Sequence, residues 1–154
     1  MGNSEQLIDR VSDGGSPTEP HLPPPRSAPD EDIAAALAAW AGLFNQGKYF
    51  EAHEVLEHAW LLAAEPDKTF LKGLIHAAVA LYQYRRGNGH GARVKYGSCI
   101  GYLSGYHPRY AGVDVAELAR QMDLFFAELV ALPKGSAPPP PPSPWPRVPP
   151  TEDL

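Results

Sequence analysis

The chain of 154 residues has a single cysteine and no long apolar run. Cys99 has no second cysteine for an internal disulfide, which fits a reducing compartment, and its apolar helical surroundings predict a small buried core residue. No run of about 18 apolar residues occurs, so the sequence predicts no membrane-spanning helix. The first ten residues, MGNSEQLIDR, are acidic and lack the apolar core of a signal peptide. We therefore expect a cytoplasmic protein.

A surplus of basic residues is also missing. The 18 acidic residues outnumber the 13 lysines and arginines and give a net charge of -5. A mildly acidic chain has no electrostatic attraction to a phosphate backbone or to anionic lipid headgroups. Neither nucleic acid nor a membrane is expected as a partner, which leaves an unidentified protein or a small molecule.

Proline is scarce in the middle of the chain and abundant at both ends. Six of the 18 prolines precede residue 30 and ten lie from Pro133 onward. Proline fixes φ and lacks the backbone N–H, so such segments favour extended or disordered conformations. We predict a disordered N-terminal arm over residues 1–29, one folded domain over residues 30–133 and a disordered Pro-rich tail over residues 134–154. For this tail, a plain spacer is favoured over the docking of Trp145 in an aromatic groove.

Apolar residues in the folded domain recur with helical spacing. The pattern and its turn signals predict five helices: about 31–46, 48–64, 68–88, 90–103 and one that begins near Asp114. The third of them is apolar almost all round, which predicts a central helix with neighbours on several faces. No alternating strand pattern exceeds a few residues. The predicted fold is an all-α compact bundle of about five helices.

The second predicted helix raises the question of metal chemistry. The stretch FNQGKYFEAHEVLEHAW, Phe44 to Trp60, contains two histidines and three glutamates. A zinc protease helix needs H-E-x-x-H, so that two imidazoles one turn apart bind one metal. Here His53 and His58 are five residues apart, which separates them by about 140° around the helix axis. The metalloprotease interpretation is therefore rejected.

A narrower site remains at His53 and Glu57, which are four residues apart at the edge of the apolar face. An imidazole and a carboxylate so spaced can hydrogen-bond each other, bind a metal jointly, or act as a base with its orienting acid. Two ligands make a weak metal site, so Glu54 or His76 would have to join them.

A closed network of buried polar groups is the alternative. His53 would hydrogen-bond Glu57, and Tyr49, Tyr82 or Arg85 would satisfy the remaining groups. We favour this structural network over a ligand or metal site, and both over catalysis. Seven residues form the candidate polar cluster: His53, Glu54, Glu57, Tyr49, Trp60, His76 and Arg85.

Arg85 is placed on the apolar side of the third predicted helix. An unpaired charge there would be costly, so one expectation is a carboxylate partner, with Glu54 or Glu57 first. The other is a side chain that reaches solvent from the helix end. Three further basic residues near the following turn are expected to form a solvated surface rather than an anion site: Arg86, Arg93 and Lys95.

Three segments in combination are similar to a known family. They are FNQGKYFEAHEVLEHAW, FLKGLIHAAVALYQYRRGN and the GAR sequence of residues 91–93. Over about residues 30–132 the chain resembles the bacterial, archaeal and plastid family called domain of unknown function 309. Its pattern is FNxGxYFEAHExLExxW, then a GLIQ-like helix and GNxxGA. The matching motif residues are Phe44, Asn45, Gly47, Tyr49, Glu51, His53, Glu54, Glu57, Trp60, Gly73, Gly87, Asn88, Gly91 and Ala92.

The resemblance implies a compact helical bundle without an assigned biochemical activity. His76 stands where the family typically has Gln, which weakens any scheme that makes His76 an obligatory metal ligand.

Two functional hypotheses follow. The favoured one is a non-catalytic binding or interaction module without a cofactor, in which His53 mainly supports stability. The alternative is a metal- or small-ligand-binding bundle, including a metal-dependent hydrolase, that holds a divalent metal with His53, Glu54 and Glu57.

Overall fold

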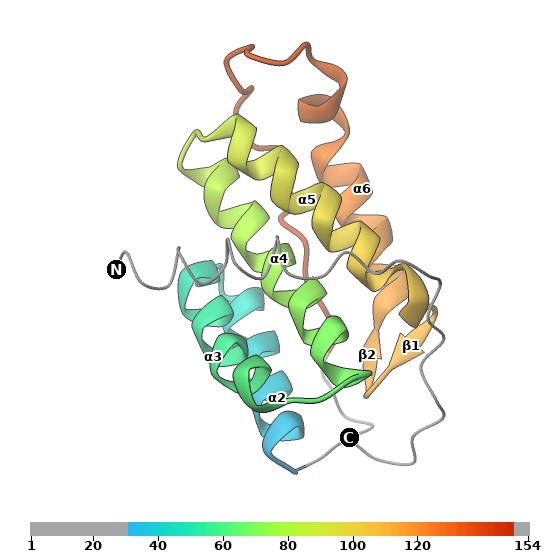
Figure 1. Cartoon of the computed structure of the whole chain (residues 1–154). Coiled ribbons are helices and arrows are strands. Elements are labelled where there is room, and N and C mark those ends of the chain that lie inside the picture. Colours follow the sequence, from blue (N-terminus) through green and yellow to red (C-terminus); the bar gives the residue numbers. More distant parts are fainter. Residues whose placement is uncertain (1–30, 150–154) are drawn as a thin grey trace.

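The computed structural model describes residues 31–149 of the chain. Within these residues the chain forms five α-helices, a short 3-10 helix and one small antiparallel sheet (Figure 1). The elements are α2 (Glu31–Asn45), α3 (Tyr49–Leu62), α4 (Asp67–Arg85), α5 (Gly89–Leu103), η1 (Ser104–Tyr106), β1 (Arg109–Tyr110), β2 (Val113–Asp114) and α6 (Val115–Ala131). The predicted helical bundle is confirmed. The N-terminal arm predicted over residues 1–29 lies outside the described residues.

Helix α2 shows how apolar spacing and a glycine define an element. Its predicted stripe of Ile33, Leu37, Trp40 and Phe44 is buried. Gly47 has a φ of +78°, a left-handed conformation that favours glycine. This conformation lets the Lys48 N–H donate to the Leu43 carbonyl oxygen at 2.9 Å, which ends α2 and starts the chain back along α3.

Helix α4 is the centre of the molecule, as predicted. It packs against α3 on one side and α5 on the other (Figure 1). Gly73 permits the close approach of α5, because a Cβ at this position would lie 2.6 Å from Leu103 Cδ2. Helix α6 continues the bundle beyond α5, and the two-residue strands β1 and β2 pair Tyr110 with Val113 at its start.

The residues after α6 differ from the sequence-based expectation of a disordered tail. Residues 134–149, here called the C-terminal strap, return along the bundle behind α4 in Figure 1. The Asn45 side chain holds the strap by two hydrogen bonds with the Val148 backbone: Nδ2 donates to the carbonyl oxygen and Oδ1 accepts from the N–H, both at 2.8 Å. The Arg147 N–H donates to Gln121 Oε1 at 2.8 Å.

Apolar contacts also hold the strap. Trp145 packs its ring against Tyr49 and Phe125, with centroids 5.7 and 4.7 Å apart. Val148 is 4% exposed and belongs to the core. An extended proline-rich chain leaves its remaining backbone groups free for outside partners, and here side chains of the bundle supply those partners. Trp145 therefore anchors the chain to its own domain.

Candidate functional site

Helix α3 places His53 and Glu57 together, as their spacing predicted. His53 Nε2 lies 3.9 Å from Glu57 Oε2, and the two side chains are 1% and 12% exposed. Burial, with a smaller contribution from the negative charge of Glu54, raises the pKa of Glu57 to about 7. The carboxyl group therefore gains or loses a proton near neutral pH, beside a buried imidazole.

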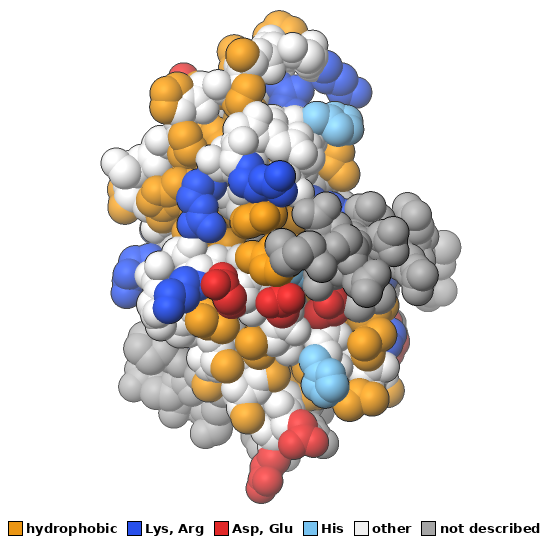
Figure 2. All heavy atoms as spheres, turned by 90° about the vertical axis from the view of Figure 1, so that its left-hand side faces the viewer, with side chains coloured by type: hydrophobic (Ala, Val, Ile, Leu, Met, Phe, Trp, Pro, Cys, Tyr) orange, Lys and Arg blue, Asp and Glu red, His pale blue; other side chains and the backbone are white. Residues whose placement is uncertain are grey.

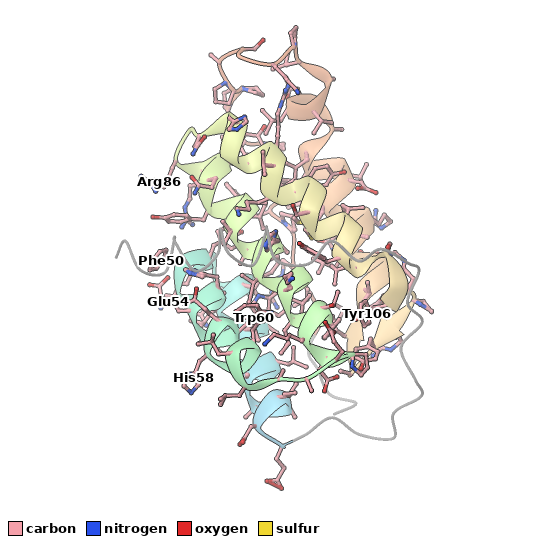
Figure 3. The ribbon with its side chains drawn as sticks, in the orientation of Figure 1. Phe50, Glu54, His58, Trp60, Arg86 and Tyr106 are labelled. Atoms are coloured by element: carbon pink, nitrogen blue, oxygen red, sulfur yellow. The ribbon has the colours of Figure 1, made fainter. Side chains whose placement is uncertain are left out.

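The surroundings of this pair are aromatic on one side. The Phe50 ring lies 4.7 Å from the His53 ring and 5.3 Å from the Tyr82 ring, measured between centroids. Glu54 and His58 lie on the exposed outer face of α3, where they point away from the bundle (Figure 3). The predicted separation of His53 from His58 around the helix is therefore present in the structure.

A metal centre at the pair would have few protein ligands. Within residues 31–149, no three His, Cys, Asp or Glu side chains come together as a group that could hold a metal ion. Glu54 and His76 therefore do not complete a three-ligand set with His53 and Glu57. The pair alone offers one nitrogen donor and one carboxylate.

Arg85 meets a carbonyl group and an aromatic ring instead of the carboxylate expected from sequence. Its Nη1 donates to the Gly47 carbonyl oxygen at 2.5 Å, and its Cζ lies 5.0 Å from the centroid of the Tyr49 ring. The side chain is exposed at the end of α4, in agreement with the second expectation. Tyr49 is itself buried, and burial raises its pKa to about 12 although the Arg85 charge opposes the shift.

Trp60 lies at another place on α3, near its end. Its ring is half-buried, and the Lys68 ammonium group stands 4.3 Å from the ring centroid. Lys68 Nζ also donates to the Trp60 carbonyl oxygen at 2.8 Å. This cation–aromatic contact connects the end of α3 to the first turn of α4.

His76 lies at the contact between α4 and α5. It is fully buried, and its ring meets the Tyr102 ring edge to face with centroids 5.3 Å apart. Burial is the main cause that lowers the pKa of His76 to about 3, and the charges of Lys95 and Lys72 lower it further. His76 is thus a neutral imidazole in a basic environment.

Sequence reasoning missed the role of the two lysines around His76. Lys95 was expected in a solvated surface, but it is 8% exposed, and Lys72 is 6% exposed. The available signal was the i,i+4 spacing of Lys72 and His76 on the least apolar strip of α4. Of the other two basic residues, Arg86 is exposed as expected, whereas Arg93 donates to the carbonyl oxygens of Leu129 and Leu132.

Comparison with known proteins supports the motif-based resemblance. Residues 37–94 match the family model described as "Domain of unknown function (DUF309)". The DUF309 match extends from α2 to the first half of α5 and so contains His53, Glu57, Lys72 and His76. It is narrower than the range of residues 30–132 over which the motifs suggested similarity.

A relative to which this chain is similar is an uncharacterized protein of Aquifex aeolicus (strain VF5). It is 41% identical over 59 residues, which make up 38% of this chain. The chain covers only 16% of the length of that relative. The similarity therefore covers a small part of that relative and carries no activity to this protein.

Proposed function

We propose that this protein is a non-catalytic interaction module that binds a protein partner through the exposed end of α3. The observation that carries this proposal is the pair Leu61 and Leu62, which are 53% and 79% exposed. Two consecutive leucines held in water are costly, and contiguous exposed apolar surface is typical of interaction sites. Figure 2 views the molecule from the side that carries α3, with hydrophobic side chains distributed among polar and charged ones.

The neighbouring Trp60 strengthens this assignment. The Lys68 ammonium group lies over its half-buried ring. The end of α3 therefore combines an aromatic side chain, a cation and two aliphatic side chains. Aromatic residues in a partly apolar patch with polar neighbours are characteristic of protein–protein interfaces. We call Trp60, Leu61, Leu62 and Lys68 the α3-end patch.

Enclosure of the His53–Glu57 pair argues against a catalytic role. A catalytic group must contact its substrate, but His53 is only 1% exposed. No helix within residues 31–149 is long and apolar enough to cross a membrane. Together with the buried Cys99 thiol, this is compatible with the cytoplasmic location that we also propose.

Site-specific photo-crosslinking tests the interaction surface. A photoreactive amino acid at Leu62 of the full chain should give discrete crosslinked adducts in cells of the source organism, and Leu61→Ser should abolish them. Leu124 on α6 provides the matched control, because it is 66% exposed but lies outside the α3-end patch. Equal adducts from positions 62 and 124, or adducts that persist with Leu61→Ser, would contradict the proposal.

The second candidate is binding of a metal or small ligand at the pair, with hydrolysis as its most specific form. It is favoured by the 3.9 Å approach of His53 Nε2 to a carboxylate whose pKa is about 7. Elemental analysis and melting with and without a chelator separate the candidates. Stoichiometric metal in the full chain, lost in a well-folded His53→Ala variant, would establish the second candidate and remove the first.

A further inference from the structure

The C-terminal strap is held at its far end rather than along its length. Residues 134–144 are exposed or half-buried, whereas Val148 is buried. The ring contacts of Trp145 and the backbone hydrogen bonds of Arg147 and Val148 lie close together in sequence. A segment whose only role was to complete the core would gain most from burial along its whole length. The strap instead resembles a short ligand, residues 145–148, on an exposed tether.

Four side chains of the bundle form the surface under this short ligand. Asn45 ends α2 and Tyr49 begins α3. Gln121 and Phe125 lie one turn apart on α6. The Trp145 ring contacts both aromatic rings, while the two amide side chains contact the strap backbone. We call Asn45, Tyr49, Gln121 and Phe125 the strap-docking surface.

The two amide side chains bind peptide backbone groups. Asn45 forms two 2.8 Å hydrogen bonds with Val148, because its Nδ2 donates to the carbonyl oxygen and its Oδ1 accepts from the N–H. Gln121 Oε1 accepts from the Arg147 N–H at 2.8 Å. Extended proline-rich peptides leave such backbone groups free, and the domains that recognise these peptides offer them aromatic surfaces. An extended segment of another chain with the same aromatic anchor could make the same contacts.

Contacts within the bundle orient part of this surface. Glu117 Oε2 accepts a hydrogen bond from Gln121 Nε2 at 2.9 Å, which leaves the Gln121 amide oxygen facing the strap. Arg120 holds Glu117 in turn, through hydrogen bonds of 2.8 and 2.6 Å. The Tyr49 ring packs on the buried Phe44 ring, with centroids 5.5 Å apart. Groups that are oriented before a ligand arrives lose less entropy when it binds.

We infer that the strap-docking surface binds an extended, proline-flanked segment of a partner protein, and that the strap occupies this surface as a tethered competitor. The strap sequence SPWPRVP, residues 143–149, defines the chemistry of the segment. It needs an aromatic residue for the place of Trp145 and an aliphatic residue three positions later. Arg147 and Pro149 are exposed, so the surface borders on solvent. The strap-docking surface adjoins the start of α3, whereas the α3-end patch lies at its other end.

The tether determines how strongly a partner segment must compete. A short linker gives its ligand an effective concentration of about 1 mM. A strap that is docked in about 99 of 100 molecules then has an intrinsic dissociation constant of about 10 µM. A free peptide of this sequence should therefore bind an open surface at about 10 µM, and the wild type about 100-fold more weakly.

Fluorescence anisotropy with a labelled peptide of residues 143–149 tests the inference. In the full chain, Trp145→Ala removes the aromatic anchor of the strap and opens the surface. The peptide should bind this variant, checked for native helical circular dichroism, at least tenfold more tightly than it binds the wild type. A peptide that itself carries Trp145→Ala should not bind.

Matched variants locate the binding. Asn45→Ala, added to Trp145→Ala, should weaken peptide binding about tenfold or more, because two hydrogen bonds are lost. Gln46→Ala is the control, since it removes an exposed amide at the neighbouring position and should leave binding unchanged. Leu61→Ser in the α3-end patch should also leave it unchanged, so failure of this inference is distinguishable from failure of the proposed interaction surface.

Fluorine NMR of the wild type keeps the inference testable if Trp145→Ala does not fold. With 5-fluorotryptophan in the full chain, several millimolar unlabelled peptide should move the Trp145 resonance toward its position in the isolated peptide. Trp40 and Trp60 provide internal references. A Trp145 resonance that stays in place would contradict the inference.

Three further results would overturn the inference. The first is the absence of peptide binding to folded Trp145→Ala, and the second is equal binding to this variant and the wild type, which would place the peptide elsewhere. The third is a concentration-dependent wild-type dimer that dissociates on Trp145→Ala substitution. Such a dimer would assign the strap-docking surface to a second copy of the chain.

Discussion

Glu57 is both acidic and largely buried, and these two properties conflict at neutral pH because an ionised carboxylate needs hydration. Its side chain is only 12% exposed, yet an ionised carboxylate at such a position loses much of its hydration. Burial consequently raises its pKa from the ordinary value of 4.5 to about 7. The folded protein therefore holds a proton on Glu57 at pH values at which the unfolded chain has already lost it.

The raised pKa of Glu57 makes the free energy of unfolding depend on pH. Between pH 4.5 and about 7 the folded state binds more protons at Glu57 than the unfolded state, so the free energy of unfolding falls as the pH rises. Glu57→Gln replaces the carboxyl group by an amide that stays neutral. We expect this variant to be more stable than the wild type by about 1 kcal/mol at pH 8 and to show a smaller difference at pH 4.

Urea unfolding at pH 4, 6 and 8 measures this effect. Glu51→Gln is the matched control, since Glu51 is exposed on the same helix and should change stability little at any pH. A Glu57→Gln variant less stable than the wild type at pH 8 would show that the ionised carboxylate stabilises the fold, in which case its pairing with His53 outweighs its desolvation.

At the scale of elements, the contact between α4 and α5 depends on Gly73. A methyl group at this position would lie 2.6 Å from Leu103 Cδ2 and 3.3 Å from Tyr102 Cβ. Overpacking of this kind typically costs about 1–3 kcal/mol. We therefore expect Gly73→Ala to lower the stability by that amount, as measured by thermal or urea unfolding.

Gly101 on α5 is the matched control for this substitution. A Cβ built there meets nothing within 4 Å, so Ala at position 101 should add up to about 1 kcal/mol of stability through its better helix propensity. Opposite signs for the two variants are the expected result. Equal stabilisation of both glycine variants would contradict the conclusion that α4 and α5 pack too closely at Gly73 to admit a methyl group.

The elements were predictable because helical patterns are local in sequence. Apolar spacing within each segment identified the stripe of α2, the central position of α4 and the meeting of His53 with Glu57. Contacts between helices were less predictable. The helical pattern predicts on which side of its own helix Lys95 or Arg85 lies. Whether the side chain is buried depends on how neighbouring elements pack and on where the long side chain ends.

At the scale of the whole molecule, the contacts of the C-terminal strap were even harder to predict from sequence than the contacts between helices. Composition predicted a disordered Pro-rich tail from residue 134 onward, and residues 134–149 form no helix. It could not show that Val148 would meet Asn45, because these residues are 103 positions apart and their hydrogen bonds need the assembled bundle. A tryptophan within a proline-rich run was the one local signal of docking, and its partners Tyr49 and Phe125 lie on α3 and α6.

The strap should therefore contribute to the stability of the bundle. A chain that ends after Pro133 loses the ring contacts of Trp145, the burial of Val148 and the hydrogen bonds to Asn45. Removal of a well-packed aromatic side chain alone typically costs about 3–5 kcal/mol, and part of this is recovered as strap entropy. We expect the shortened chain to lose about 2–4 kcal/mol in urea unfolding.

Two further variants separate docking from chain length. A chain that ends after Pro149 keeps every strap contact described here and should unfold like the full chain. Trp145→Ala in the full chain should reproduce most of the loss, because Trp145 joins the strap to both Tyr49 and Phe125. Equal stability of the full chain, the Trp145→Ala variant and the chain ending after Pro133 would mean that residues 134–149 are a spacer, as composition alone had suggested.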